Sequence, residues 1–385
     1  MSHPLDQRRE FLFLYDIRMG NPNGDPDENR PRRLPDGTFY VTDVRLKRFV
    51  RDWLKTQGEA ILVDQPENSA MNLTDRVQHF LASPPESVRE ECEKYKALWK
   101  ALEEQAKKKP KKKKKQSKDS TGDSDSTPDD EPQTDTTGDE GGESSPADDS
   151  KDDPKKSEAG RQVVSIILKS FIDARLFGSS LAFKDWDVNP RPKTLTGAVQ
   201  INMGEILHQA QEVDIAGTST FSSKGKEENR TGTFTTFFGL RYGLIGFNGV
   251  ANEHSAKLSG LTDDDYERFL KALWKSVSGA PTANTRSKKG QVPRLLVDVT
   301  YKPGSEFQFG CLLNYAKVLP KDKTESSIAS PDDYTLDLTR LTERLSHPCV
   351  QRVRYALHPD IRHEPAALPW EPWDLDRMAA ESGRA

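Results

Sequence analysis

The residues with the clearest chemical potential lie between Arg18 and Arg51. A loop from Asn21 to Arg33, crowded with Asn, Gly, Asp and Pro, follows the apolar run Phe11–Ile17 and precedes a basic segment. Residues of these types form turns and tolerate positive φ. A buried strand would thus present an arginine-bearing loop at the surface, where binding groups commonly lie. An ordinary charged strand–turn–helix connection is the alternative interpretation.

Two further basic segments suit contacts with phosphate groups. Thr282–Pro293 contains one arginine and two lysines, and Phe221–Thr231 contains an aromatic residue, two lysines and an arginine. Arginine and lysine release counterions from a polyanion when they bind its phosphates. Either segment taken singly is typical of a solvated hairpin tip. Three such loops on one sheet favour binding of a polyanion.

Motifs for catalysis or metal binding are missing from the sequence. It has no phosphate-binding P-loop, no dinucleotide fingerprint, no H-E-x-x-H and no G-x-S-x-G. Asp25, Asp27 and Glu28 offer the oxygen atoms that hard cations prefer, but pairing with nearby arginines explains them more simply. His358 and His363 have a weak metal spacing. We therefore expect no cofactor and no metal.

Charge and cysteine usage narrow the class of protein. The net charge is −4, so the whole chain lacks the basic excess typical of nucleic-acid binders. The three cysteines form no CxxC pair, which argues against a disulfide framework or a zinc site. The N-terminal residues lack a signal-peptide core, and no apolar run approaches membrane-spanning length. We expect a soluble, cytoplasmic protein with no membrane partner.

The segment Lys107–Glu158 differs from the rest of the chain. It contains nine lysines between Lys107 and Lys118, followed by a stretch rich in acids, Ser, Thr, Gly and Pro, and it has no aromatic residue. Such a composition cannot bury enough apolar surface to offset the entropy of ordering. We predict a disordered insertion there, and one domain formed by residues 1–106 and 159–385.

Periodicity predicts a mixed sequence of elements. Strands are expected at Glu10–Arg18, Gly197–Met203, Thr233–Val250 and Leu295–Tyr301, and helices at Asp43–Gln57, Asn72–Leu81, Pro85–Gln105, Arg161–Leu176, Thr262–Val277 and Leu336–Leu345. This order indicates an α+β fold with helices on one face of a sheet. A split β-α-β arrangement of the ferredoxin or RNA-recognition type fits it, although the aromatic octapeptide of true RNA-recognition modules is missing.

Five collinear motifs resemble those of a known family. They begin at Asn21 (the loop through Arg33 and the basic segment Val41–Arg48), Asp173, Leu195, Tyr242 and Thr285. The chain is similar to the backbone subunit of type I CRISPR surveillance complexes, the Cas-seven group of the RAMP superfamily. The Thr285–Gln291 motif looks more like the I-B branch than the I-C branch. The long charged insertion departs from the family pattern, in a region where helical finger elements are expected.

The resemblance implies a hand-shaped protein with a modified RNA-recognition-like palm, helical fingers and a thumb-like hairpin at about residues 204–236. Copies would assemble head to tail along the crRNA and present it for pairing with target DNA. Other Cascade subunits and a recruited helicase-nuclease are the implied partners, and the subunit itself would not be an enzyme. A metal-dependent RNase of the type III kind, using Asp25 or Asp27, is the alternative. An assembly protein that binds no nucleic acid is a third hypothesis.

The same resemblance assigns RNA contacts to the palm loop, the basic helix, the thumb and the second basic loop. These residues are Asn21, Asn23, Gly24, Asn29, Arg30, Arg32, Arg45, Lys47, Arg48, Arg51, Phe221, Ser222, Lys224, Lys226, Arg230, Arg286, Ser287, Lys288 and Lys289. Arginine and lysine bind phosphates without reading sequence, as a guide of variable sequence requires. Base pairing would then supply target specificity.

Overall fold

The computed structural model describes residues 3–64, 71–108, 154–181, 183, 194–218, 234–321 and 324–375. Its α-helices are α1 (Asp43–Thr56), α2 (Leu73–Ala82), α3 (Arg89–Lys108), α4 (Pro154–Ser170), α5 (Ile172–Phe177), α6 (Glu253–Ser259), α7 (Asp263–Gly279) and α8 (Thr339–Leu345). Short 3-10 helices are η2 (Glu86–Val88), η3 (Pro281–Asn284), η4 (Leu312–Tyr315), η5 (Glu325–Ser327) and η6 (Pro331–Asp333). Helix and strand are mixed along the chain, which confirms the α+β class.

The strands are β1 (Arg9–Gly20), β2 (Tyr40–Val41), β3 (Gly178–Ser180), β4 (Thr194–Thr196), β5 (Val199–Ile201), β6 (Gly204–Ile206), β7 (Glu212–Thr218), β8 (Phe234–Ala251), β9 (Gln291–Tyr301), β10 (Lys317–Pro320), β11 (Tyr334–Asp337), β12 (Val350–Leu357), β13 (His363–Glu364) and β14 (Glu371–Pro372). The main sheet has the order β14-β12-β9-β1-β8-β6-β2, and β5 and β7 also pair with β8. Strand β1 is antiparallel to both neighbours, β8 and β9. The first strand of the chain is therefore central in the sheet.

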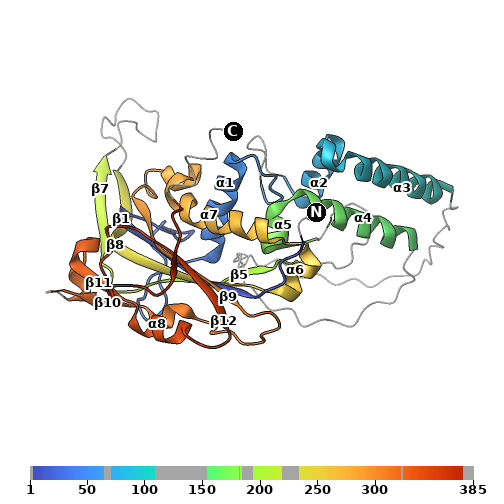
Figure 1. The fold of residues 1–385 in the computed structure, drawn as a ribbon. Coiled ribbons are helices and arrows are strands. Elements are labelled where there is room, and N and C mark those ends of the chain that lie inside the picture. The colour runs from blue at the N-terminus through green and yellow to red at the C-terminus, as the bar shows by residue number, and fades with distance from the viewer. Residues whose placement is uncertain are drawn as a thin grey trace, which may run out of the picture.

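Both faces of the sheet are covered (Figure 1). Helices α1 and α7 lie on one face, and α8 with the small sheet β10-β11-β13 lies on the other. Because successive side chains of a strand point to opposite faces, Phe13 and Tyr15 join the core under the helices while Leu12 and Leu14 join the second core. Full burial of such a side chain stabilises the fold by roughly 1.5–3 kcal/mol. This two-sided burial explains why the sequence shows a continuous apolar run.

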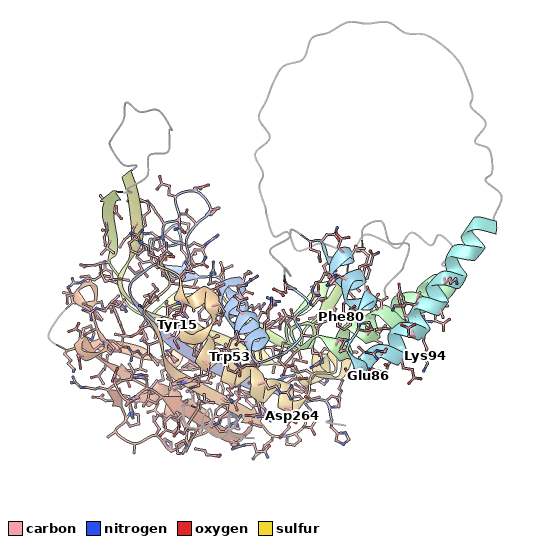
Figure 2. All side chains as sticks on the ribbon, turned by 90° about the horizontal axis from the view of Figure 1, so that it is seen from above. Tyr15, Trp53, Phe80, Glu86, Lys94 and Asp264 are labelled. Atoms are coloured by element: carbon pink, nitrogen blue, oxygen red, sulfur yellow. The ribbon has the colours of Figure 1, made fainter. Side chains whose placement is uncertain are left out.

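A third group of apolar side chains lies within α2, α3 and α4, beside the sheet rather than on it. Seen from above, Phe80 of this helical group is well separated from Tyr15 in the sheet core (Figure 2). The two ends of the predicted insertion, Lys107–Lys108 and Pro154–Glu158, are helical and belong to α3 and α4, contrary to the disorder predicted for them. The remainder of the predicted insertion, 109–153, lies outside the described residues.

Most predicted elements are confirmed, including the start of α7. Thr262 accepts a hydrogen bond from the Asp265 backbone N–H at 3.1 Å, and the Asp265 carboxylate accepts one from the Thr262 N–H at 3.2 Å. This reciprocal capping box satisfies backbone donors that have no partner within the helix. The Thr-Asp-Asp-Asp sequence was therefore a reliable start signal.

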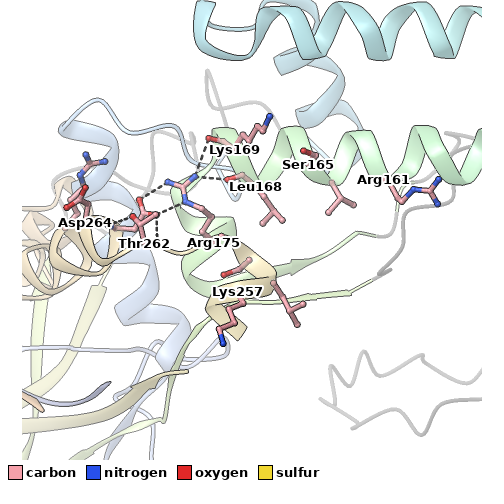
Figure 3. A pocket seen from close by; sticks show the side chains of 14 residues that line it. Arg161, Ser165, Leu168, Lys169, Arg175, Lys257, Thr262 and Asp264 are labelled. Atoms are coloured by element: carbon pink, nitrogen blue, oxygen red, sulfur yellow. Dashed lines mark hydrogen bonds and ion pairs between the residues drawn. The ribbon is translucent and has the colours of Figure 1, made fainter. Parts of the chain in front are cut away.

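The single helix predicted for Arg161–Leu176 was wrong. Phe171 adopts an extended conformation (φ −114°, ψ 113°) that ends α4 and begins α5. Its ring packs on Phe80 at 4.7 Å between centroids. Across the break, the Arg175 guanidinium donates to the Leu168 carbonyl at 2.7 Å and forms two 2.8 Å bonds with Asp265 (Figure 3). These tertiary contacts override a continuous helical pattern.

The helix predicted for Leu336–Leu345 was also wrong at its start. Leu336 pairs with Val318 in the small sheet, and its N–H donates to the Arg362 carbonyl at 2.9 Å. The helix begins only at Thr339, whose N–H donates to the Asp337 carboxylate at 2.9 Å. Backbone pairing with segments distant in sequence therefore determines the conformation of this segment.

Candidate nucleic-acid interface

The loop after β1 is shaped by its own side chains. The Asp25 carboxylate accepts hydrogen bonds from the backbone N–H groups of Asp27, Glu28 and Asn29, at 3.1, 2.8 and 3.0 Å. Asn29 takes a left-handed conformation at φ 58°, which asparagine tolerates better than most residues. The Asp25 carboxylate therefore stabilises the turn of the loop.

Asn23 connects this loop to α1. Its Oδ1 accepts hydrogen bonds from the Thr42 N–H at 2.9 Å and the Thr42 hydroxyl at 2.8 Å. Thr42 in turn caps α1 by accepting from the Arg45 N–H at 3.3 Å. The loop thus lies next to the helix N-terminus, which carries a partial positive charge that favours anions.

A second segment, residues 285–290, closes the loop from the other side. The Asn21 N–H donates to the Ser287 carbonyl at 2.7 Å, and the Lys288 ammonium donates to the Asn21 carbonyl at 2.7 Å. Gly290 has φ 97°, and a Cβ there would lie 3.2 Å from the Arg18 carbonyl oxygen. The two predicted basic loops, more than 260 residues apart, are therefore one surface, which we call the palm-loop surface (residues 18–33, 42–48 and 285–290).

Buried positive charge lies under this surface. Burial, followed by repulsion from Arg45, lowers the pKa of Lys288 to about 8. Burial also lowers the pKa of Arg45. The buried Arg45 Nε and Asn21 Oδ1 have no hydrogen-bond partner within the described part of the chain. The unused Arg45 Nε–H is a donor that suits an anionic ligand, whereas Asn21 Oδ1 is an acceptor and suits a donor such as a hydroxyl.

Three cations of the palm-loop surface are exposed. Arg18, Arg286 and Lys289 extend into solvent, and the structure records no ion pair between them and any described carboxylate. Arg18 was not on the predicted contact list, although its position directly after an apolar strand was a signal for it. Free cations at the rim of a loop are suited to phosphate contacts.

Other predicted contacts hold the loop in place. Arg30 bonds to Glu28 at 2.7 Å and Glu212 at 3.0 Å, and its guanidinium lies 3.8 Å from the centre of the Phe238 ring. Arg33 also pairs with Glu212. The Nε of Arg32 donates to the Gly24 carbonyl at 3.2 Å. Arg30 and Arg33 therefore fix the loop against β7 and β8, and Arg32 stabilises the loop internally.

Except for Arg45, the predicted RNA contacts of α1 have acidic partners. Lys47 pairs with Asp43 at 2.7 Å and Arg48 with Asp52 at 2.9 Å, each one turn apart along the helix. Arg51 instead pairs with the fully buried Asp173 at 2.9 Å. Lys47 and Arg48 nevertheless remain partly accessible to solvent, with 16% and 44% of their side chains exposed. The Arg51 pair is structural.

The predicted thumb contacts Phe221, Ser222, Lys224, Lys226 and Arg230 lie outside the described residues. The strands that lead to them are described. Strands β7 and β8 pair from Glu212↔Leu240 to Thr218↔Phe234 and extend beyond the main body as a ribbon (Figure 1). This ribbon begins beside Arg30 and Arg33, so it adjoins the palm-loop surface.

Metal binding finds no support in the described ranges. No group of three His, Cys, Asp or Glu residues there is arranged to hold a metal ion. His358 contacts Arg294, whereas His363 contacts the Pro365 carbonyl, so the two histidines serve separate local contacts. No described helix is both long and apolar enough to cross a bilayer.

A separate cavity of about 590 Å³ lies between α4, the C-terminal end of α6 and the N-terminus of α7 (Figure 3). Arg161, Lys169 and Lys257 line it, but Lys169 pairs with Glu91 and the central Arg175 is bound to Asp265. The residues of this cavity do not overlap with those of the palm-loop surface.

Comparison with known proteins agrees with the motifs on the palm-loop surface. The chain is 30% identical over 352 residues to the CRISPR-associated protein Cas7 of Haloferax volcanii, covering 88% of this chain and 82% of the relative. Its fold is similar to a chain of a CRISPR RNA-guided surveillance complex in a pre-nicking state, with a TM-score of 0.52, 14% identity, and coverage of 97% and 100% of the two chains. The model of the family CRISPR-associated protein Cas7 matches residues 7–339. The chain therefore belongs to the Cas7 family.

Proposed function

We propose that this chain is a non-catalytic backbone subunit that binds crRNA and polymerises along its spacer in a type I CRISPR interference complex. The main support for this proposal is that hydrogen bonds link the Asn21–Arg33 loop to the 285–290 segment around Lys288. It presents the exposed cations Arg18, Arg286 and Lys289 beside a capped helix N-terminus. This surface binds phosphates and leaves bases free to pair with target DNA.

The architecture supports the assignment of palm, fingers and thumb. Strand β1 lies between β8 and β9, antiparallel to both, and α1 and α7 cover the same face. This order is consistent with the split β-α-β arrangement expected for the palm. We assign α2, α3 and α4 to the fingers and the β7–β8 ribbon to the base of the thumb. The Thr285–Gln291 motif favours the I-B branch, with I-C as second choice.

Further partners follow from the same proposal. They are target DNA through the guide, further copies of the chain arranged head to tail, other Cascade subunits and a recruited helicase-nuclease. The site of action is the cytoplasm, where guide and target meet.

Purification of the full chain with a matching crRNA tests the proposal. We expect RNA of defined length to co-purify, a raised ratio of absorbance at 260 and 280 nm, and multimers whose size grows with the guide. Protein that carries no RNA and stays a monomer with any guide would support an assembly role without nucleic acid.

The alternative, a metal-dependent RNase using Asp25 or Asp27, has less support. The Asp25 carboxylate already accepts three backbone hydrogen bonds, and Asp27 is exposed at the tip of the same turn. Incubating the protein with Mg²⁺ and labelled RNA complementary to the guide separates the two functions. Cleavage that Asp25→Asn or Asp27→Asn abolishes would establish the RNase.

A further inference from the structure

A second polar site lies on the other face of β1, next to the palm-loop surface. A cavity of about 590 Å³ opens between the end of β1, the start of β9 and residues 330–332 of the layer that covers the second face of the sheet. Arg18, Met19 and Gly290, which belong to the palm-loop surface, line one side. This volume lies within the range of roughly 300–1,000 Å³ typical of small-ligand sites.

The floor of this cavity is a buried carboxylate, and only one of its two oxygens accepts hydrogen bonds. Asp16 is 2% exposed, and its Oδ2 accepts hydrogen bonds from Arg294 Nε at 2.8 Å and the Tyr242 hydroxyl at 2.9 Å. Both donors are themselves buried, so the position of Asp16 is fixed. Its second oxygen, Oδ1, has no hydrogen-bond partner in the described ranges and is not enclosed by protein.

The free oxygen requires a hydrogen-bond donor. An ionised carboxylate only accepts hydrogen bonds, and it repels phosphate. Arg18 follows Asp16 by two positions on the same face of β1, about 7 Å away along the strand. A phosphate bound by Arg18 would place the adjoining sugar over Asp16, and the apolar side chain of Met19, 47% exposed, borders the same cavity.

The sugar supplies the donor that fits. Base amino groups vary with sequence, whereas a guide of any sequence has a 2′-hydroxyl on each nucleotide. That hydroxyl distinguishes RNA from DNA, and a site built to bond a hydroxyl rejects the analogue that lacks it. Building on the proposed guide-binding function, we propose that Asp16 Oδ1 accepts a hydrogen bond from a ribose 2′-hydroxyl of the guide and makes the palm selective for RNA over DNA.

Three oligonucleotides with the same base sequence test this proposal on the unmodified full-length protein: RNA, uniformly 2′-fluoro RNA and DNA. The 2′-fluoro strand keeps the sugar pucker of RNA but has no hydroxyl proton. We expect fluorescence anisotropy to show binding at least about tenfold weaker for 2′-fluoro RNA than for RNA, because the hydrogen bond to the charged carboxylate is lost. Equal affinity for the two strands would overturn the inference, whereas binding to none of the strands would remove the proposed function itself.

Two variants localise the effect. In Asp16→Asn the amide oxygen must face Arg294 and Tyr242, so Nδ2 faces the cavity and offers a donor in place of an acceptor. This variant should lose the preference for RNA over 2′-fluoro RNA. Asp360→Asn changes the other carboxylate that contacts Arg294, at 3.2 Å, and that lines the same cavity. It should keep the preference, and loss of the preference in this variant instead would make Asp360 the acceptor and overturn the role of Asp16. If Asp16→Asn keeps the full preference for RNA, Asp16 does not have the proposed role. If that variant does not fold, the comparison of RNA with 2′-fluoro RNA on the native chain still tests the proposal.

Discussion

Arg51 on α1 donates a hydrogen bond to Asp173 at 2.9 Å, although 122 residues separate them in the sequence. The same carboxylate, fully buried, accepts hydrogen bonds from the backbone N–H groups of Leu62 and Val63 at 2.7 and 3.1 Å. Asp173 thus ties the basic helix, the chain that follows it and α5 together. Two residues that the sequence assigned to separate motifs form one structural link.

We expect Arg51→Ala to destabilise the fold by about 3–5 kcal/mol, because it leaves a buried carboxylate without its cation. Urea denaturation followed by circular dichroism measures this loss. Arg48→Ala is the matched control one turn away. It should cost clearly less than Arg51→Ala, because Arg48 is 44% exposed and its partner Asp52 keeps a hydrogen bond from the Thr282 hydroxyl. Equal effects of the two substitutions would show that the Asp173 link contributes little.

The exposed cations should determine how binding depends on salt. The double variant Arg286→Ala, Lys289→Ala should weaken RNA binding for all sequences alike. It should reduce the slope of log affinity against log salt by about 1.4, or about 0.7 per phosphate contact on a single strand. Lys94→Ala with Lys96→Ala, on α3 away from the palm-loop surface, is the control and should leave the slope unchanged (Figure 2). If the two double variants change the slope equally, the palm-loop surface is not the specific RNA-binding site.

Lys288 should make RNA affinity depend on pH. Its pKa of about 8 means that the free protein loses this charge as pH rises from 7 to 9. Bound phosphates favour the charged form, so affinity should fall across this window, and Lys288→Arg should be insensitive because arginine stays charged. Binding titrations at constant ionic strength measure the effect.

Stability should change in the opposite direction. The unfolded chain keeps the lysine proton up to a pKa of 10.5, whereas the folded chain loses it near 8. The unfolded state therefore binds more protons between these values, and the contribution of Lys288 to stability rises with pH. Affinity and stability that fall together would point to general unfolding rather than to titration of Lys288.

The segment between β7 and β8 should be needed for assembly. Deleting Ser222–Asn229 leaves the described pairing of the two strands, up to Thr218↔Phe234, intact. We expect a folded protein whose guide-dependent multimers are short or missing, because stacking of a side chain on an unstacked base contributes roughly 1–3 kcal/mol. Size-exclusion chromatography and nuclease footprinting measure this. Full-length multimers with unchanged periodic protection would place the thumb elsewhere.

The charged segment 109–153 should be dispensable for folding and guide binding. The helices on either side of it share one core, which includes Cys92 and Tyr95 of α3 and Val163 and Ile167 of α4. Replacing the segment with a Gly/Ser linker of the same length should keep both properties. Loss of multimers in the replaced protein, with RNA affinity retained, would give the segment a role in assembly.

Local signals in the sequence were enough to predict much of the fold. The apolar run after Glu10, the cap at Thr262 and the aromatic run into β8 each specify an element through neighbours within a few residues. The periodicity of a strand or helix is a property of the local chain, so it can be read without knowing the fold. The collinear motifs likewise indicated the family from the sequence alone.

Contacts between distant segments were decided only by the tertiary structure. The break at Phe171 depends on Arg175 reaching α7, and no local pattern contains that partner. The hydrogen bond between Lys288 and the Asn21 carbonyl requires β1 and β9 to lie side by side. Arg51 and Arg48 look equivalent on a helical wheel, yet Arg51 pairs with a fully buried carboxylate from a distant segment, whereas Arg48 pairs with Asp52 of its own helix. The sequence by itself determined which residues are basic and on which elements, and the packing of the sheet decided which of these cations remain free for a ligand, because that depends on carboxylates brought from far along the chain.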